Sequence, residues 1–149
     1  MAVVVFYEKP GCSGNARQKA WLEASGHTVV ARNILQANWS RMDLRSFLQN
    51  LPMAQWFNMN APLVKSGGIV PGDFSQADEP VVLALLQADP LLIRRPFLEV
   101  DGVRRAGFDI REIHAWIGLS AALDESGQPV ENPGCRPDID SAQRCTYTS

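Results

Sequence analysis

The 149-residue sequence predicts a single α/β domain built on a small mixed sheet. The chain opens with an apolar strand, a helix and a second strand, and it later returns with a hairpin followed by an amphipathic helix. A sequence that is 46% hydrophobic and 20% charged has the composition of a globular protein. Its length is typical of one domain and allows a substantial buried core.

The first elements form a strand, helix, strand unit. Val3 to Tyr7 is a run of β-branched and aromatic residues that ends at Lys9-Pro10-Gly11, which predicts a buried strand entering a tight turn. A helix is expected from Ser13 to about Ser25, where Gly26 supplies a stop signal. Residues 27–31 predict a second strand, parallel to the first because a helix connects the two.

The middle of the chain is predicted to be a helical insert. Ser40 and Asp43 resemble a capping box for a helix that ends near Pro52. Residues 56–74 are rich in Asn, Pro and Gly and show no clear period. Residues 78–89 predict a further helix, with an aspartate as its N-cap and a proline at its first position.

A hairpin and a helix complete the domain. Two short runs, 97–100 and 103–106, flank Asp101-Gly102, a two-residue turn typical of hairpins. A last helix capped by Asp109 is expected to end at Gly118. This order of elements is the thioredoxin plan with extra helices between its halves. We therefore predict a thioredoxin-like fold with a helical insertion and a mixed four-stranded sheet.

The predicted domain covers residues 1–122. From residue 123 the sequence shifts to Ser, Pro, Asn, Asp and Gln and loses its periodicity, so residues 123–149 are expected to form a mobile, disordered tail. The chain carries no basic surplus, which argues against direct nucleic-acid binding. Its apolar start is too short for a membrane span and lacks the features of a signal peptide, so a cytoplasmic location is expected.

Cys12 is the best candidate for chemistry because it stands where the first strand gives way to the first helix. The free N–H groups and the positive dipole end of that helix would stabilise a thiolate there. A turn residue at this place is expected at the surface, and the alternative is a buried, inert cysteine. Residue 15, where the second thiol of a Cys-x-x-Cys motif would stand, is Asn15, so an internal disulfide of that kind is excluded.

The remaining cysteines and the histidines give weaker signals. Cys135 and Cys145 lie in the predicted tail and could act as distant resolving thiols, although nothing in their spacing requires it. His27 and His114 have no metal-ligand spacing with each other or with the cysteines, so no metal site is expected. No bound cofactor is predicted.

Two segments carry a resemblance to a known family. The segments are Tyr7-Glu8-Lys9-Pro10-Gly11-Cys12, followed by Arg17 and Trp21-Leu22, and Pro90-Leu-Leu-Ile-Arg-Arg-Pro96. In them the sequence resembles the arsenate reductase family, which also includes Spx-type transcription regulators. The similarity covers about residues 3–118. It implies a thioredoxin fold with a helical insert, in which Cys12 is the nucleophile.

The resemblance also assigns residues around the cysteine. Arg95 would be an oxyanion ligand, and Pro96 would match the proline that is cis in this fold and packs near the cysteine. The implied anion-binding arginines and the residues that shape the site are, together, Arg95, Arg94, Arg17, Pro96 and Gly11. Glutathione or glutaredoxin, or another external thiol, would be the reductant.

A narrower resemblance is to the nitrogenase-associated branch of that family. It rests on the run from Phe6 to Cys12 with Asn15-Ala-Arg-Gln18, on the Trp56-Phe57 pair, on Ala61-Pro62 and Lys65-Ser66-Gly67, and on Leu91 to Pro96. Proteins of that branch occur alongside nitrogen-fixation genes, so the resemblance implies a protein partner in nitrogen fixation.

The sequence departs from the arsenate reductases at three places. Glu8 replaces a histidine, and its negative charge would disfavour a nearby thiolate unless Lys9 offsets it. Two of the three anion-binding arginines fall at Trp56 and Gly107. Three other arginines could substitute for them or could be ordinary salt-paired surface residues; these are Arg94, Arg104 and Arg105. At most one of the last two can face a shared site, since successive strand residues point to opposite faces.

Three hypotheses about function follow. In the leading one, the protein is a thiol-based redox protein in which Cys12 attacks an oxidised substrate or oxyanion, Arg95 stabilises negative charge and an external thiol resolves the intermediate. The alternative is a non-catalytic binding or regulatory protein associated with nitrogen fixation or redox control. In the third, Cys12 is a sensor thiol that is oxidised reversibly without turnover.

Overall fold

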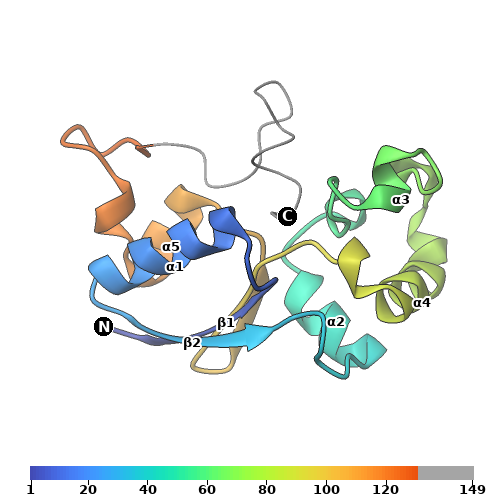
Figure 1. The fold of residues 1–149 in the computed structure, drawn as a ribbon, viewed down its shortest axis with the longest axis horizontal. Coiled ribbons are helices and arrows are strands. Elements are labelled where there is room, and N and C mark those ends of the chain that lie inside the picture. Colours follow the sequence, from blue (N-terminus) through green and yellow to red (C-terminus); the bar gives the residue numbers. More distant parts are fainter. Residues whose placement is uncertain (131–149) are drawn as a thin grey trace.

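The computed structural model describes residues 1–130, and residues 131–149 are not described (Figure 1). Most of the predicted tail, with Cys135 and Cys145, therefore lies outside the described residues. Its first part, residues 123–130, forms a turn in which Leu123 makes a β-bridge with Pro129. The backbone N–H of Val130 donates to the carbonyl of Ala122, which ties this turn to the end of the domain.

The sheet has four strands in the order β2-β1-β3-β4. The strands are β1 (Val3–Glu8), β2 (Thr28–Asn33), β3 (Phe97–Val100) and β4 (Val103–Ala106). β1 runs parallel to β2 and antiparallel to β3, and β3 pairs antiparallel with β4. The predicted mixed four-stranded sheet of a thioredoxin-like fold is confirmed.

Within residues 1–130 the structure has five α-helices: α1 (Ser13–Ala24), α2 (Arg41–Leu48), α3 (Pro62–Lys65), α4 (Glu79–Ala88) and α5 (Ile110–Ile117). α1 and α5 lie together over one face of the sheet, whereas the insert with α2, α3 and α4 lies to the other side (Figure 1). No helix of the described residues is long and apolar enough to cross a membrane.

The predicted elements differ from the observed ones mainly at the edges and in the insert. β2 continues to Asn33 because its backbone pairs with β1 as far as Glu8, and its polar end is tolerated on an exposed edge strand. Residues 56–74, where no clear period was found, contain α3 and the short 3₁₀ turn Pro71–Asp73. These elements are too short for a helical period to be visible in the sequence.

The core divides into two clusters on the two sides of the sheet. One cluster joins the sheet to α1 and α5 and includes Val4, Phe6, Leu22, Leu98 and Ile113. The other joins the sheet to the insert through aromatic rings, and it includes Trp39, Phe47, Phe57, Leu86 and Phe97. Phe47 stacks on Phe97 with ring centroids 4.6 Å apart. The turn that carries Cys12 leaves the sheet at the end of β1 and leads into α1.

Candidate functional site

Cys12 is the N-cap of α1. Its Sγ accepts a hydrogen bond from the backbone N–H of Asn15 at 3.3 Å, and its own N–H donates to the carbonyl of Lys9 at 3.1 Å. Gly11 precedes it with φ of 85°, a conformation that favours glycine. The cysteine therefore sits at the helix start that the sequence predicts, in a turn whose shape depends on Gly11.

The expectation that Cys12 lies at the surface was wrong. Only 2% of the residue is exposed. The cap geometry turns the side chain back over the first turn of α1, and Arg95, which comes from a segment distant in the sequence, packs against it. Because the covering residue lies far along the chain, the local turn signals gave no indication of it.

Arg95 is the charged partner of this thiol. It is 4% exposed, and burial lowers the pKa of its guanidinium, whereas the charge of Cys12 and a side-chain hydrogen bond to Cys12 act in the opposite direction. Its Nε and Nη1 atoms donate no hydrogen bond within residues 1–130. The structure thus brings together, in a buried place, the cysteine and the arginine that the sequence singled out.

Pro96 follows in the same segment, and the Arg95–Pro96 peptide bond is cis, as the resemblance implies. The carbonyl of Pro96 accepts a hydrogen bond from the N–H of Gly107 at 2.8 Å. This bond ties the arginine segment to the end of β4.

Asn15 and Gln18 form a buried polar pair beside the cysteine that sequence reasoning missed. Asn15 is 0% and Gln18 3% exposed, and the Nδ2 of Asn15 donates to the Oε1 of Gln18 at 2.9 Å. The Oδ1 of Asn15 accepts from the backbone N–H of Lys9 at 3.3 Å. The two residues are three positions apart at the start of a helix, and residues with this spacing are neighbours on the helix surface. This spacing was the signal that could have indicated the pair.

The charges of Glu8 and Lys9 are arranged differently from the expectation. Glu8 is paired with Lys19, whose Nζ lies 2.8 Å from its Oε1, so Lys19 and not Lys9 offsets that negative charge. Burial lowers the pKa of Lys9, the positive charge of Arg95 lowers it further, and Cys12 raises it. Lys9 therefore contributes positive charge near the thiol, since Glu8 forms its salt bridge with Lys19.

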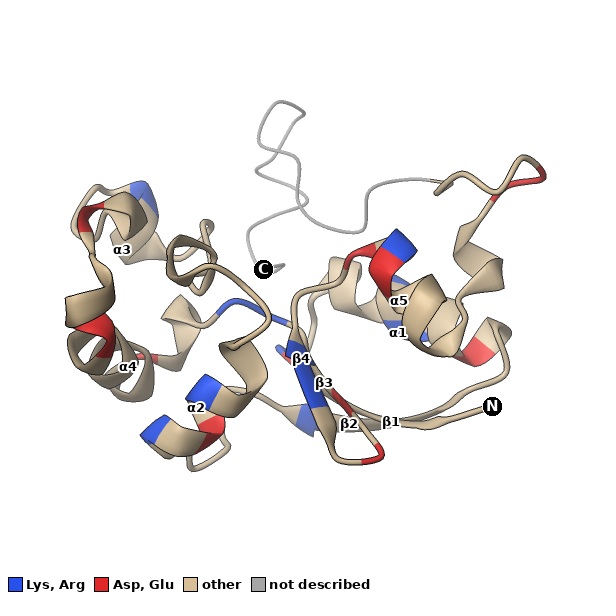
Figure 2. Ribbon diagram, turned by 180° about the vertical axis from the view of Figure 1, so that it is seen from behind, with Lys and Arg blue, Asp and Glu red and all other residues tan. Residues whose placement is uncertain are grey.

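The two arginines of β4 do not join Cys12. Arg104 pairs with Glu99 at 3.1 Å and with Asp43 at 3.3 Å. Arg105 lies over the ring of Trp116, with 4.6 Å from its Cζ to the ring centroid. Their partners lie on opposite faces of the sheet, Asp43 in α2 and Trp116 in α5, as the strand alternation predicts. Figure 2 shows the basic, blue stretch of the β4 ribbon. Arg104 is therefore a salt-paired residue, which is one of the two alternatives that the sequence left open.

Two other arginines have different surroundings. Arg94 packs against Gly107, where an added Cβ would lie 3.6 Å from its Nε, and burial lowers the pKa of its guanidinium. The absence of a side chain at Gly107 thus leaves room for Arg94. Arg17 lies on an exposed part of α1. Anion binding by Arg94 and Arg17 stays a prediction.

Trp56 belongs to the core. It is 4% exposed and its indole Nε1 donates to the carbonyl of Leu51 at 2.9 Å. His27 is also structural, since its Nδ1 accepts from the N–H of Ala2 and its Nε2 lies 2.8 Å from the carbonyl oxygen of Gly118. In the part of the chain that the structure describes, no group of three His, Cys, Asp or Glu side chains could hold a metal ion.

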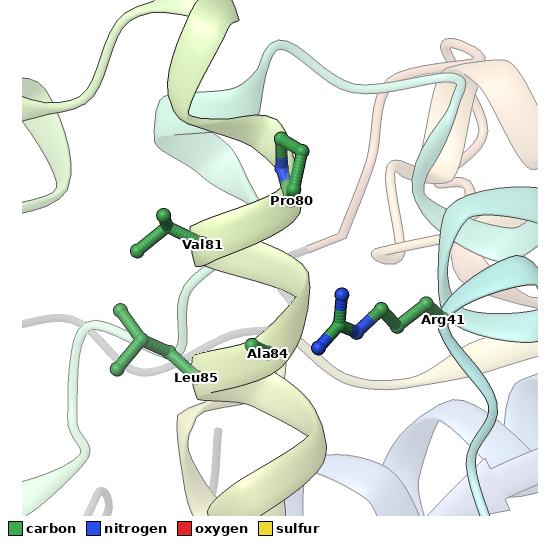
Figure 3. A pocket seen from close by; sticks show the side chains of 5 residues that line it. All are labelled: Arg41, Pro80, Val81, Ala84 and Leu85. Carbon is green, nitrogen blue, oxygen red and sulfur yellow. The ribbon is translucent and has the colours of Figure 1, made fainter.

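A shallow groove of about 380 Å³ lies away from Cys12, along α4. Its lining is mostly apolar, and the side chain of Arg41 extends from α2 toward α4 across it (Figure 3). The lining residues are Arg41, Pro80, Val81, Ala84 and Leu85. None of them belongs to the cysteine and arginine site.

Solved structures place this fold with the arsenate reductases. A protein of Bacteroides fragilis described as related to the ArsC family superposes with a TM-score of 0.62 at 22% identity, covering 75% of this chain and 95% of that chain. The arsenate reductase of Vibrio cholerae gives a TM-score of 0.60 at 23% identity, covering 79% and 98%. The chain therefore has the α/β, ArsC-like form of the thioredoxin fold.

The sequence comparison is more specific. A Rhodospirillum rubrum protein, described as an uncharacterized 15.7 kDa protein in the draG 3′ region, is 49% identical over 121 residues, which are 81% of this chain and 82% of that protein. No family model matches the sequence. The chain belongs to the same family as this Rhodospirillum rubrum protein.

Proposed function

We propose that the protein is a thiol-based redox protein in which Cys12 is the nucleophile and Arg95 stabilises negative charge on the thiolate and on a bound oxyanion. The observation that carries this proposal is the buried contact between the two side chains at the N-terminus of α1. The positive charge of a guanidinium favours the ionised form of a neighbouring thiol. The contact therefore supports a cysteine that works as a thiolate.

The chemistry proceeds in two-electron steps. The Cys12 thiolate attacks the central atom of an oxidised substrate, and hydroxide leaves and is protonated to water. An external thiol then attacks the Cys12 sulfur, and the electron pair of the broken bond stays with the substrate, which is reduced. A second external thiol attacks the resulting mixed disulfide and releases Cys12 as a thiolate. Two external thiols become one disulfide in each cycle.

The burial of Cys12 favours a small substrate. With 2% of the residue exposed, a bulky protein disulfide has little access to Sγ, whereas a compact oxyanion could be drawn toward Arg95 and Lys9. Arsenate is the first candidate because the fold is that of the arsenate reductases. Glutathione, with or without glutaredoxin, is the corresponding external thiol.

The test is turnover of arsenate with glutathione, measured as glutathione disulfide formed. The Cys12→Ser variant is expected to lose all thiol-dependent turnover. The matched control is the Cys135→Ser/Cys145→Ser variant, which keeps Cys12 and should keep the activity. Full activity in the Cys12→Ser variant would overturn the proposal, and so would the absence of turnover in the unaltered chain with arsenate and with glutathione mixed disulfides.

A second candidate function is a non-catalytic binding protein associated with nitrogen fixation or redox control. The observation that favours it is the replacement of two anion-binding arginines by the buried Trp56 and by Gly107, against which Arg94 packs. The resemblance to the nitrogenase-associated branch indicates where a partner would be sought. If a tagged chain retains no partner from cells that make nitrogenase, this candidate loses its support.

A further inference from the structure

We infer that Asn15 is a positioning residue that holds the Cys12 thiol against Arg95, and this inference rests on the proposed function. Asn15 is 0% exposed, and each of its polar groups that faces the cysteine turn is hydrogen-bonded. Its backbone N–H donates to the Sγ of Cys12 at 3.3 Å. Its side chain bonds both to the turn before the cysteine and to the helix after it.

Two hydrogen bonds, one made by Asn15 and one by Cys12, hold the cysteine turn at Lys9. The Oδ1 of Asn15 accepts from the N–H of Lys9 at 3.3 Å, and the carbonyl of the same Lys9 accepts from the N–H of Cys12 at 3.1 Å. Both backbone groups of Lys9 are therefore held by residues at the start of α1. This arrangement fixes the path of the chain from Lys9 to Cys12 and, with it, the direction of the thiol.

The orientation of the Asn15 amide is determined by its neighbours. A backbone N–H can only donate, so the atom facing Lys9 must be the oxygen. The NH₂ group then faces Gln18, whose Oε1 accepts at 2.9 Å. Because a buried amide that loses its partners costs about 1–3 kcal/mol, the pair resists rotation. Asn15 thus provides a rigid support where a dithiol protein would carry its second cysteine.

The consequence is that the effect of Arg95 on Cys12 depends on Asn15. Removing the Asn15 side chain releases the N–H of Lys9, and the turn is then free to move the thiol away from the guanidinium. Removing the side chain of Gln18 leaves the Lys9 bond in place. Gln18→Ala is therefore a matched control, since Gln18 is buried like Asn15 and its hydrogen bond to Asn15 lies within α1.

The experiment measures alkylation of Cys12 at pH 7 in full-length Cys135→Ser/Cys145→Ser protein, with and without Arg95→Gln. With Asn15 present, Arg95→Gln is expected to slow alkylation about tenfold, as for a lost hydrogen bond to a charged group. In the Asn15→Ala background, we expect Arg95→Gln to change the alkylation rate by less than about twofold. The reason is that the guanidinium of Arg95 would no longer be held against the Cys12 thiol, so the two side chains would no longer be energetically coupled. In the Gln18→Ala background the effect of Arg95→Gln should remain large.

The outcomes separate this inference from the proposed function. If Arg95→Gln slows alkylation equally with and without the Asn15 side chain, Asn15 does not position the thiol, while the proposed pair stands. If Arg95→Gln has no effect in the unaltered background, both fail. Should Asn15→Ala not fold, Asn15→Asp replaces it, since its oxygen can still accept from Lys9. The effect of Arg95→Gln should then persist, and its loss would overturn the inference.

Discussion

The starts of α1 and α5 are capped in the same way by chemically different residues. At α5 the carboxylate of the exposed Asp109 accepts from the N–H of Glu112 at 3.0 Å. At α1 the thiol of the buried Cys12 accepts from the N–H of Asn15 at 3.3 Å. Oxygen is a strong acceptor and aspartate a preferred N-cap, whereas sulfur is a weak acceptor.

This difference distinguishes a cap that serves stability from a cap for which we propose a chemical role. Asp109 needs no partner beyond the helix it begins. Cys12 is a weaker cap, and it is buried beside the guanidinium of Arg95. This arrangement supports a role for its sulfur that an oxygen could not fill.

Replacing Cys12 by serine should abolish function without harming the fold. Serine supplies a better cap oxygen, so the free energy of unfolding is expected to change by no more than about 1 kcal/mol. Thiol turnover should fall to the background rate. Urea unfolding measures the first quantity and glutathione oxidation the second. A large loss of stability would show that the sulfur is instead needed for packing.

The reciprocal exchange, Asp109→Cys, moves a thiol cap to the exposed helix start. It should lower the free energy of unfolding by about 1 kcal/mol and the Tm by about 4 °C. In a background in which the three native cysteines are serine, the new thiol should be alkylated at the same rate with Arg95 or with Gln at position 95. A rate that depends on Arg95 would contradict the view that the α1 site is special.

The smallest effect concerns Asp124, another exposed oxygen acceptor. Hydrogen bonds from the Ser126 side chain and from the Gln128 backbone hold the pKa of this carboxyl below its ordinary value of 3.8. A lowered pKa in the folded protein means that the stabilisation is complete above pH 3.8 and is lost as the pH falls through the lowered value.

This loss should be visible as a shift of the Ser126 and Gln128 amide resonances on acid titration, with no change in thiol chemistry. Asp124→Asn is the control, because its amide oxygen still accepts but does not titrate in this range. Amide resonances that stay fixed in the native protein down to pH 2 would show that these bonds do not depend on the charge of Asp124.

The parts of the fold that the sequence predicted depend on local signals. The caps at Ser40 and Asp109, the proline at the start of α4 and the Asp-Gly hairpin each act within a few residues, and all are present in the structure. The four-stranded sheet followed from the order of these elements. The pairing of Cys12 with Arg95 came from the resemblance and not from the local pattern.

The features that were missed depend on contacts between distant segments. Cys12 is buried because Arg95 packs against it, which no turn signal encodes. Lys19 reaches Glu8 from α1, and the sequence alone does not decide between Lys19 and the adjacent Lys9 as the partner of Glu8. The space at Gly107 could be assigned to Arg94 only after both segments were placed together.

The most direct test of the central claim is the pH profile of Cys12 alkylation in the Cys135→Ser/Cys145→Ser protein, compared with the same protein carrying Arg95→Gln. If Arg95 stabilises the thiolate, the profile of the variant shifts to higher pH, and its rate at pH 7 falls about tenfold. Superimposable profiles would contradict the claim. Cys12 would then be a structural cap like Asp109, and the search would turn to a binding partner.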